Sequence, residues 1–178
     1  MKKRLFVAIN FDPATRLAIA RLMSCLPNQP GLIKTKVDNL HLTLLFLGDT
    51  DEELIPQLAR ELEDITKNYG SLSLKFGSLG GFPDLKRPQT IWIGIDGDGL
   101  GQLQRSIAER LLSIVRPVDT KPFLPHLTIA RANGSRPPSQ IGQIAIDLPP
   151  VAISQVDLME SILAPGGSVY KRISAHRL

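Results

Sequence analysis

The sequence has a single cysteine, few aromatic residues and no long apolar run, and each scarcity excludes a class of protein. Cys25 has no partner for an internal disulfide, which favours a reducing compartment. Aromatic residues make up 5% of the 178 residues, too few for a surface that reads a long single strand by stacking. No stretch reaches the roughly 18 apolar residues of a membrane span, or the apolar core of a secretory signal. We therefore expect a cytoplasmic protein with no membrane association.

Several motifs that mark well-known catalytic sites are also absent. There is no Walker A sequence, no G-x-S-x-G elbow and no full dinucleotide-binding fingerprint. Gly97, Gly99 and Gly101 have G-x-G-x-G spacing before a predicted helix, but a flexible turn is the better interpretation than a phosphate cradle. The two histidines discussed below have no third ligand in fixed register, so we expect no metal and no cofactor.

Positive charge is in mild excess and is scattered along the chain. The net charge is +4 and the basic residues form only short clusters, such as Lys2-Lys3-Arg4 and Lys171-Arg172. A protein that binds a long duplex usually carries a stripe of basic residues. A small anionic ligand or the end of a nucleic-acid strand fits this balance better.

Apolar periodicity predicts strands and helices in mixed order within a single domain, residues 1–178. Strand patterns cover residues 4–10, 32–37, 41–48, 71–82, 90–96 and 126–131, with further strands toward the C-terminus. Helices are predicted from Asp12-Pro13 to near Pro27, after a capping box formed by Thr50 and Glu53, and over residues 99–115. Pro56 indicates that the second helix is kinked or starts later. Hairpin-like strand pairs favour an α+β fold with antiparallel sheets over a parallel doubly wound sheet.

The most informative feature is a His-Leu-Thr sequence that occurs twice, each time at the start of an apolar strand. Residues i and i+2 of a strand share a face, so His41 lies beside Thr43 and His126 beside Thr128. The second histidine follows the first by 85 residues, about half the chain, which predicts two similar lobes facing one cleft. One imidazole can act as general base and the other as general acid, while the hydroxyls donate to developing charge. This chemistry suits an in-line displacement at phosphorus.

Strict alternation along the same strands leads to three further expectations. Phe46 points into the core rather than the cleft, and Arg131 lies on the face opposite His126 unless the strand bends. Trp92 packs in the core or between the lobes. His176, which has no partner motif, is expected at the surface.

These blocks resemble the 2H phosphoesterase superfamily, and within it the RNA 2′,3′-cyclic phosphodiesterase branch, also called the 2′-5′ RNA ligase family. The resemblance rests on RLFVAIN, NLHLTLLFLG, GGFPDLKRPQTIWIGI, PHLTIAR and LMESILAPGGSVY, in that order over nearly the whole chain. It implies a bilobal α+β fold with antiparallel sheets lining a central cleft and helices outside. It places His41, Thr43, His126 and Thr128 at catalytic positions and gives Arg131 a contact with the substrate phosphate.

The resemblance also implies a reaction: opening of an RNA 2′,3′-cyclic phosphate to a 2′-phosphate, without a metal. His126 would activate water and His41 would protonate the 3′ oxygen, although the reverse assignment fits the sequence almost as well. Some members also join RNA ends through a 2′-5′ linkage, but the Lys-x-Asp-Gly motif of ATP-dependent ligases is missing here. The expected partners are RNA ends or nucleoside 2′,3′-cyclic phosphates, and the expected state is a monomer.

Two other functions remain open at this point. One is an RNA-end or nucleotide-binding module that keeps the cleft without significant turnover. The other is a related phosphodiesterase that acts on 2′-5′ oligonucleotides or on another cyclic nucleotide. Intact His-x-Thr motifs in both halves argue against the first, because a binding module needs no pair of acid–base groups.

Overall fold

A computed structural model of the chain describes residues 1–115, 122–132, 141, 144–165 and 167–178. Its elements, in chain order, are β1 (Lys2–Asn10), α1 (Pro13–Ser24), β2 (Leu32–Lys34), η1 (Val37–Asn39), β3 (His41–Asp51), η2 (Glu52–Leu54), α2 (Ile55–Thr66), β4 (Leu72–Phe82), β5 (Thr90–Asp96), α3 (Leu100–Leu111), β6 (His126–Ala132), β7 (Val151–Ile153), β8 (Gln155–Ala164) and β9 (Gly167–Arg177). Every described strand pair is antiparallel. The predicted α+β class is confirmed.

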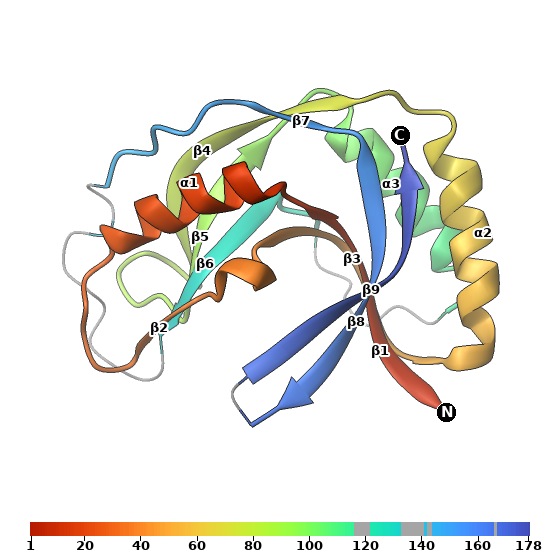
Figure 1. Cartoon of the computed structure of the whole chain (residues 1–178), viewed down its shortest axis with the longest axis horizontal. Helices are drawn as coiled ribbons and strands as arrows, with labels where there is room; N and C mark the ends of the chain where they lie inside the picture. The colour runs from red at the N-terminus through yellow and green to blue at the C-terminus, as the bar shows by residue number, and fades with distance from the viewer. Residues whose placement is uncertain (116–121, 133–140, 142–143, 166) are drawn as a thin grey trace.

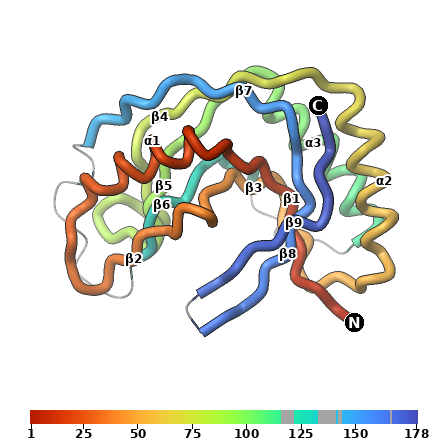
Figure 2. Tube along the Cα trace, viewed as in Figure 1, coloured from red at the N-terminus to blue at the C-terminus, as the bar shows by residue number. Residues whose placement is uncertain are grey.

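The strands follow one path that brings the two His-x-Thr strands together. Their order is β7-β4-β5-β6-β3-β1-β8-β9, and β2 pairs with β6 off this path. The two halves of the path meet where β3 pairs with β6, through the single registered pair Leu42 and Leu127. Figure 1 shows the resulting curl, with α1 on one side and α2 and α3 together on the other. The β8–β9 hairpin projects from the sheet on the open side of the curl (Figure 2).

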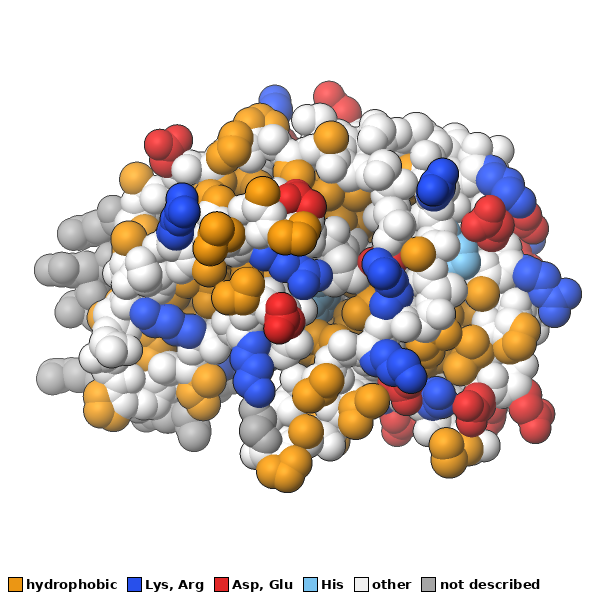
Figure 3. Space-filling view, viewed as in Figure 1, with side chains coloured by type: hydrophobic (Ala, Val, Ile, Leu, Met, Phe, Trp, Pro, Cys, Tyr) orange, Lys and Arg blue, Asp and Glu red, His pale blue; other side chains and the backbone are white. Residues whose placement is uncertain are grey.

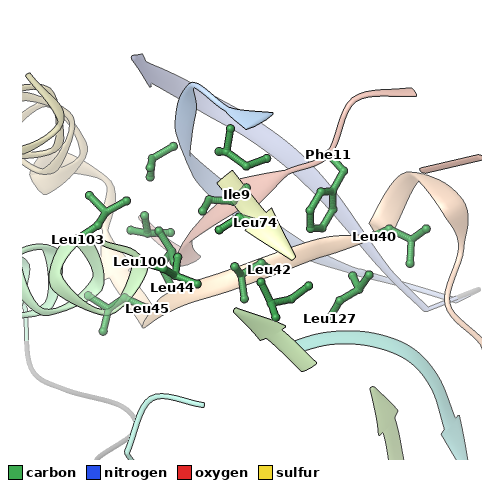
Figure 4. Close-up of a cluster of buried hydrophobic side chains, with 14 of the residues drawn as sticks. Ile9, Phe11, Leu40, Leu42, Leu44, Leu45, Leu74, Leu100, Leu103 and Leu127 are labelled. Carbon is green, nitrogen blue, oxygen red and sulfur yellow. The ribbon is translucent and has the colours of Figure 1, made fainter. Parts of the chain in front are cut away.

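The core fills the space between the sheet and the helices. Apolar side chains from both His-x-Thr strands enter one cluster, in which Leu44 and Leu45 lie near Leu100 and Leu103 of α3 and Leu127 lies toward Leu40 (Figure 4). The helices α2 and α3 pack against each other, and α3 also packs against β3. The leucines that flank each histidine therefore anchor its strand on the core side.

Each His-x-Thr strand carries a β-bulge directly after its threonine. In β3, Ala8 of β1 is opposite Thr43 and Val7 is opposite Leu45, so Leu44 is the extra residue. In β6, Trp92 of β5 is opposite Thr128 and Ile91 is opposite Ala130, so Ile129 is extra. An extra residue shifts the alternation of the strand by one position. Side chains directly beyond each bulge therefore point to the face opposite to the one that strict alternation predicts, and in β3 this holds as far as a second extra residue, Leu47.

The second helix begins differently from the prediction. Thr50 is buried within β3 and donates to backbone carbonyls, so the predicted capping box with Glu53 is wrong. A 3-10 turn follows, and α2 begins at Ile55 with Pro56 in its first turn. A proline is tolerated there because the first amides of a helix have no intrahelical acceptor. The later start indicated by Pro56 is confirmed.

The other predicted helices agree closely with those of the structure. The first helix ends at Ser24, and α3 buries Leu103, Ile107 and Leu111 on the predicted face. The strand predicted over residues 32–37 covers only β2, since a 3-10 turn follows it. No helix among the described residues is long and apolar enough to cross a membrane.

Candidate active site

A cleft of about 1020 Å³ lies between the two halves of the sheet. Its basic lining residues are Arg4, Lys34, Lys36 and Arg131, and no aspartate or glutamate is among the described residues that line it. Lys and Arg side chains gather in the middle of the face shown in Figure 3. The uncompensated positive charge favours an anionic ligand.

All five residues singled out in the sequence line this cleft: His41, Thr43, His126, Thr128 and Arg131. The pairing of Leu42 with Leu127 explains why they converge. In an antiparallel ladder through that pair, Thr43 of β3 neighbours His126 of β6, and His41 neighbours Thr128. The two motifs therefore lie side by side and antiparallel, across the seam between the two halves.

The two imidazoles are oriented in the same way. Nδ1 of His41 is 2.7 Å from the carbonyl oxygen of Asn39, and Nδ1 of His126 is 2.7 Å from that of Leu124. A carbonyl oxygen only accepts, so each Nδ1 carries a proton and donates it. Each Nε2 is then the ring nitrogen without a proton in the neutral imidazole. In the first motif Nε2 of His41 is 3.0 Å from the hydroxyl of Thr43.

Each histidine is also held between two aromatic rings. His41 lies 5.1 Å from Phe6 and 5.0 Å from Tyr170 between ring centroids. His126 lies 5.1 Å from Phe82 and 5.8 Å from Trp92. Four of the nine aromatic residues in this sequence thus serve to hold the two imidazoles. Trp92 packs beside the site, which agrees with the expected packing role.

The bulges bring two more side chains into the cleft. Phe46 and Arg131 each follow their histidine by five residues, beyond the extra residue of the bulge. Phe46 is 49% exposed and lines the cleft, so the expectation that it points into the core is wrong. Arg131 shares the cleft with His126, and its guanidinium lies 3.4 Å from the hydroxyl of Thr90. The strand bend that a role for Arg131 required is therefore present.

The electrostatic environment favours the neutral form of His41. Burial lowers the pKa of His41, and the positive charges of Arg16 and Arg131 and the nearby His126 lower it further. The hydrogen bond from Nδ1 to the carbonyl of Asn39 opposes this shift in the pKa. A bound phosphate would supply negative charge on the cleft side and raise the pKa again.

The third histidine does not belong to the cleft. His176 is 4% exposed, so the expectation of a surface position is wrong. Its Nδ1 lies 3.2 Å from a carboxylate oxygen of Glu63 on α2, and its Nε2 lies 2.8 Å from the hydroxyl of Ser174. It therefore ties β9 to α2. Gly97, Gly99 and Gly101 are likewise not among the residues of the cleft.

No three His, Cys, Asp or Glu side chains among the described residues are grouped as a metal site would require. The two cleft histidines have Thr43 and Thr128 as their polar neighbours, and a threonine hydroxyl is a poor metal ligand. The polar side chains that the cleft brings together include two imidazoles, two hydroxyls and the guanidinium of Arg131.

The antiparallel sheet and its paired His-x-Thr strands are those of a 2H phosphoesterase. The family model described as the 2′-5′ RNA ligase superfamily matches residues 12–160 of the chain. The chain belongs to this family.

Known proteins resemble this chain in sequence and in structure. The RNA 2′,3′-cyclic phosphodiesterase of Archaeoglobus fulgidus is 30% identical over 174 residues, which cover 94% of this chain and 96% of that protein. The crystal structure of TT0787 of Thermus thermophilus matches with a TM-score of 0.84 and 24% identity, covering 98% of this chain and 97% of that one. The crystal structure of E. coli LigT in apo form matches with a TM-score of 0.78 and 25% identity, covering 99% and 98%.

Proposed function

We propose that this protein hydrolyses RNA 2′,3′-cyclic phosphate termini to 2′-phosphomonoesters. The observation that carries the proposal is the antiparallel placement of His41-Thr43 against His126-Thr128 in a basic cleft. Curated relatives that share nearly the full chain are named RNA 2′,3′-cyclic phosphodiesterases. E. coli LigT has been crystallised in complexes with phosphate and with 3′-AMP, which supports a nucleotide phosphate as the ligand here.

The proposed reaction needs two proton transfers and stabilisation of negative charge. Nε2 of one histidine takes a proton from water as its oxygen bonds to phosphorus, and the P–O3′ bond breaks. Nε2 of the other histidine gives a proton to the leaving 3′ oxygen, so a 2′-phosphate remains. Thr43, Thr128 and Arg131 donate hydrogen bonds to the phosphate oxygens as charge builds up on them.

We assign His126 as the base and His41 as the acid, and the pKa of His41 sets a condition on this assignment. An acid must be protonated in the enzyme–substrate complex, whereas burial and the positive charges of the protein lower the pKa of His41 and favour its neutral form. The negative charge of a bound cyclic phosphate offsets the repulsion from Arg16 and Arg131 and raises the pKa of His41, so His41 gains its proton together with the substrate. A substrate with a bridging 3′ sulfur tests the assignment, because a thiolate leaves without a proton. It should restore turnover to His41→Ala and not to His126→Ala; rescue of His126→Ala alone would reverse the roles.

The first experiment is hydrolysis of a nucleoside 2′,3′-cyclic phosphate with EDTA present, with separation of the 2′- and 3′-phosphate products. We expect 2′-phosphate from the wild type, and a loss of about 10²–10⁴ in rate from either His41→Ala or His126→Ala. His176→Ala is the matched control, since that imidazole lies outside the cleft. No product from the wild type above the level of the double variant would refute the proposed hydrolase.

An RNA 5′-hydroxyl that replaces water at the same phosphorus would give 2′-5′ ligation, so the same site supports reversible joining as a secondary activity. A binding module without turnover is disfavoured by the orientation of both imidazoles, whose Nδ1 atoms are fixed while Nε2 remains to exchange a proton. We further propose a cytoplasmic monomer in which residues 1–178 form a single bilobal domain. Light scattering after gel filtration tests the monomer, and a single cooperative unfolding transition tests the domain.

A further inference from the structure

Among the described residues that line it, one wall of the cleft, formed by β1, β3, β8 and β9, carries a single charged side chain beyond the histidine. That side chain is Arg4, which is exposed and has no ion pair with any described carboxylate. Its neighbour Lys3 faces the other side of the strand and is held by Glu52 at 3.3 Å and Glu160 at 3.5 Å. Adjacent basic residues of β1 thus differ: Lys3 is ion-paired outside the cleft, whereas Arg4 lines the cleft and forms no ion pair with a described carboxylate.

The surroundings of Arg4 can receive an anion. The antiparallel register pairs Leu5 with Glu160, so the next residues outward, Arg4 and Ser161, are neighbours on the cleft face. On the other side of Arg4 the register places Asp49 of β3, an exposed residue that does not line the cleft and forms no ion pair with Arg4. Both Ser161 and Gly48 line the cleft. A guanidinium without an ion pair and a hydroxyl therefore occur together in the lining of the cleft.

The position of Arg4 relative to the histidines sets the length of ligand that it can contact. The ring of Phe6 lies 5.1 Å from that of His41, and Arg4 precedes Phe6 by two residues on the same face. Two residues of a strand span about 6.6 Å. The guanidinium thus lies roughly one nucleotide beyond the imidazole, on the side of the cleft where Phe46 pairs with Phe6.

We propose that Arg4, assisted by Ser161, binds the backbone phosphate on the 5′ side of the terminal nucleotide. The preferred substrate is then an RNA end with at least one internucleotide linkage, rather than a free nucleoside 2′,3′-cyclic phosphate, which lacks that phosphate. This inference rests on the proposed hydrolase function. In it, Arg4 determines the preferred length of the substrate, and the two histidines carry out the proton transfers.

The test compares kcat/KM for a nucleoside 2′,3′-cyclic phosphate with kcat/KM for di- and trinucleotides that end in the same cyclic phosphate. In the wild type we expect the ratio of trinucleotide to nucleoside to exceed about 10, from one charge-assisted contact. Arg4→Gln should bring the ratio close to one, and Ser161→Ala should lower it by a smaller factor. The salt dependence of trinucleotide turnover should also weaken in Arg4→Gln, with the log–log slope reduced by about 0.7 for one lost phosphate contact on a single strand.

Lys75→Gln is the matched control, because it removes the same charge from an exposed position on β4 that does not line the cleft. The inference is overturned if the wild type shows no length preference or if Arg4→Gln keeps that preference. It is also overturned if Lys75→Gln lowers the ratio of trinucleotide to nucleoside kcat/KM as much as Arg4→Gln does. Failure of the wild type to hydrolyse any of the three substrates would instead refute the hydrolase function itself.

Discussion

The contact between Gly80 and Trp92 makes a sharp prediction about how His126 is held. A Cβ added at Gly80 of β4 would lie 2.2 Å from two carbons of the indole ring, whereas ordinary contact begins near 3.4 Å. In Gly80→Ala the indole must therefore move by about 1.2 Å, the difference between these two distances. Trp92 packs on both His126 and Phe82, so this movement disturbs the packing that fixes the imidazole.

Two magnitudes follow for Gly80→Ala. Misplacing a catalytic group by about 1 Å can cost 10²-fold, so we expect kcat/KM on a nucleoside 2′,3′-cyclic phosphate to fall by about that factor. Overpacking of a core by one methyl group costs about 1–3 kcal/mol, so the protein should remain folded but unfold at a lower temperature. Trp92 is the only tryptophan, so its fluorescence reports the movement directly.

Gly77→Ala is the control on the same strand, because a Cβ there meets its nearest neighbour, the carbonyl oxygen of Gly94, at an ordinary 3.5 Å. It should leave both fluorescence and activity close to wild type. If Gly80→Ala shifts the fluorescence but keeps kcat/KM within twofold, then Trp92 does not position His126. If the fluorescence is unchanged, the clash itself is relieved elsewhere and the argument fails at its first step.

Two further predictions concern Phe46 and His41. Base–aromatic stacking contributes about 1–3 kcal/mol per base, so Phe46→Ala should lower kcat/KM by about 5- to 100-fold, while Phe46→Tyr, which keeps the ring, should stay near wild type; equal activity in the two variants would exclude stacking. The NMR titration of His41 should show a pKa below 6.5 in the free protein and a rise when inorganic phosphate is added, and a pKa at or above 6.5 in the free protein would refute the electrostatic argument. Because the folded pKa is lowered, neutral His41 contributes no penalty above pH 6.5, and stability should decline as the pH falls from 6.5 through the folded pKa.

Strand alternation correctly predicted that each histidine lies on the same face as its threonine, and the reason is local. His41 and Thr43 are two positions apart, as are His126 and Thr128, and each bulge lies after its threonine. Alternation therefore holds within each motif. It fails beyond the bulge, and for that reason Phe46 was placed in the core.

The bulges themselves follow from pairing with other strands. The extra residue in β3 is defined by its partner β1, and the one in β6 by its partner β5. Leu44-Leu45 and Ile129-Ala130 are apolar pairs that either strand phase accommodates. The burial of His176 depends in the same way on Glu63, which is 113 residues distant in sequence. Interactions between distant segments leave no periodic signal in the segment itself.

The two halves of the cleft are alike in what orients a histidine and differ in what surrounds the substrate. In both, a carbonyl two residues before the histidine fixes Nδ1, two aromatic rings hold the imidazole and a bulge follows the threonine. At the equivalent position after the bulge, one half has Phe46 and the other has Arg131. An apolar ring suits a base or ribose, and a guanidinium suits a phosphate. In the proposed reaction, Phe46 and Arg131 therefore orient the substrate in one direction, and the two similar histidines perform opposite proton transfers.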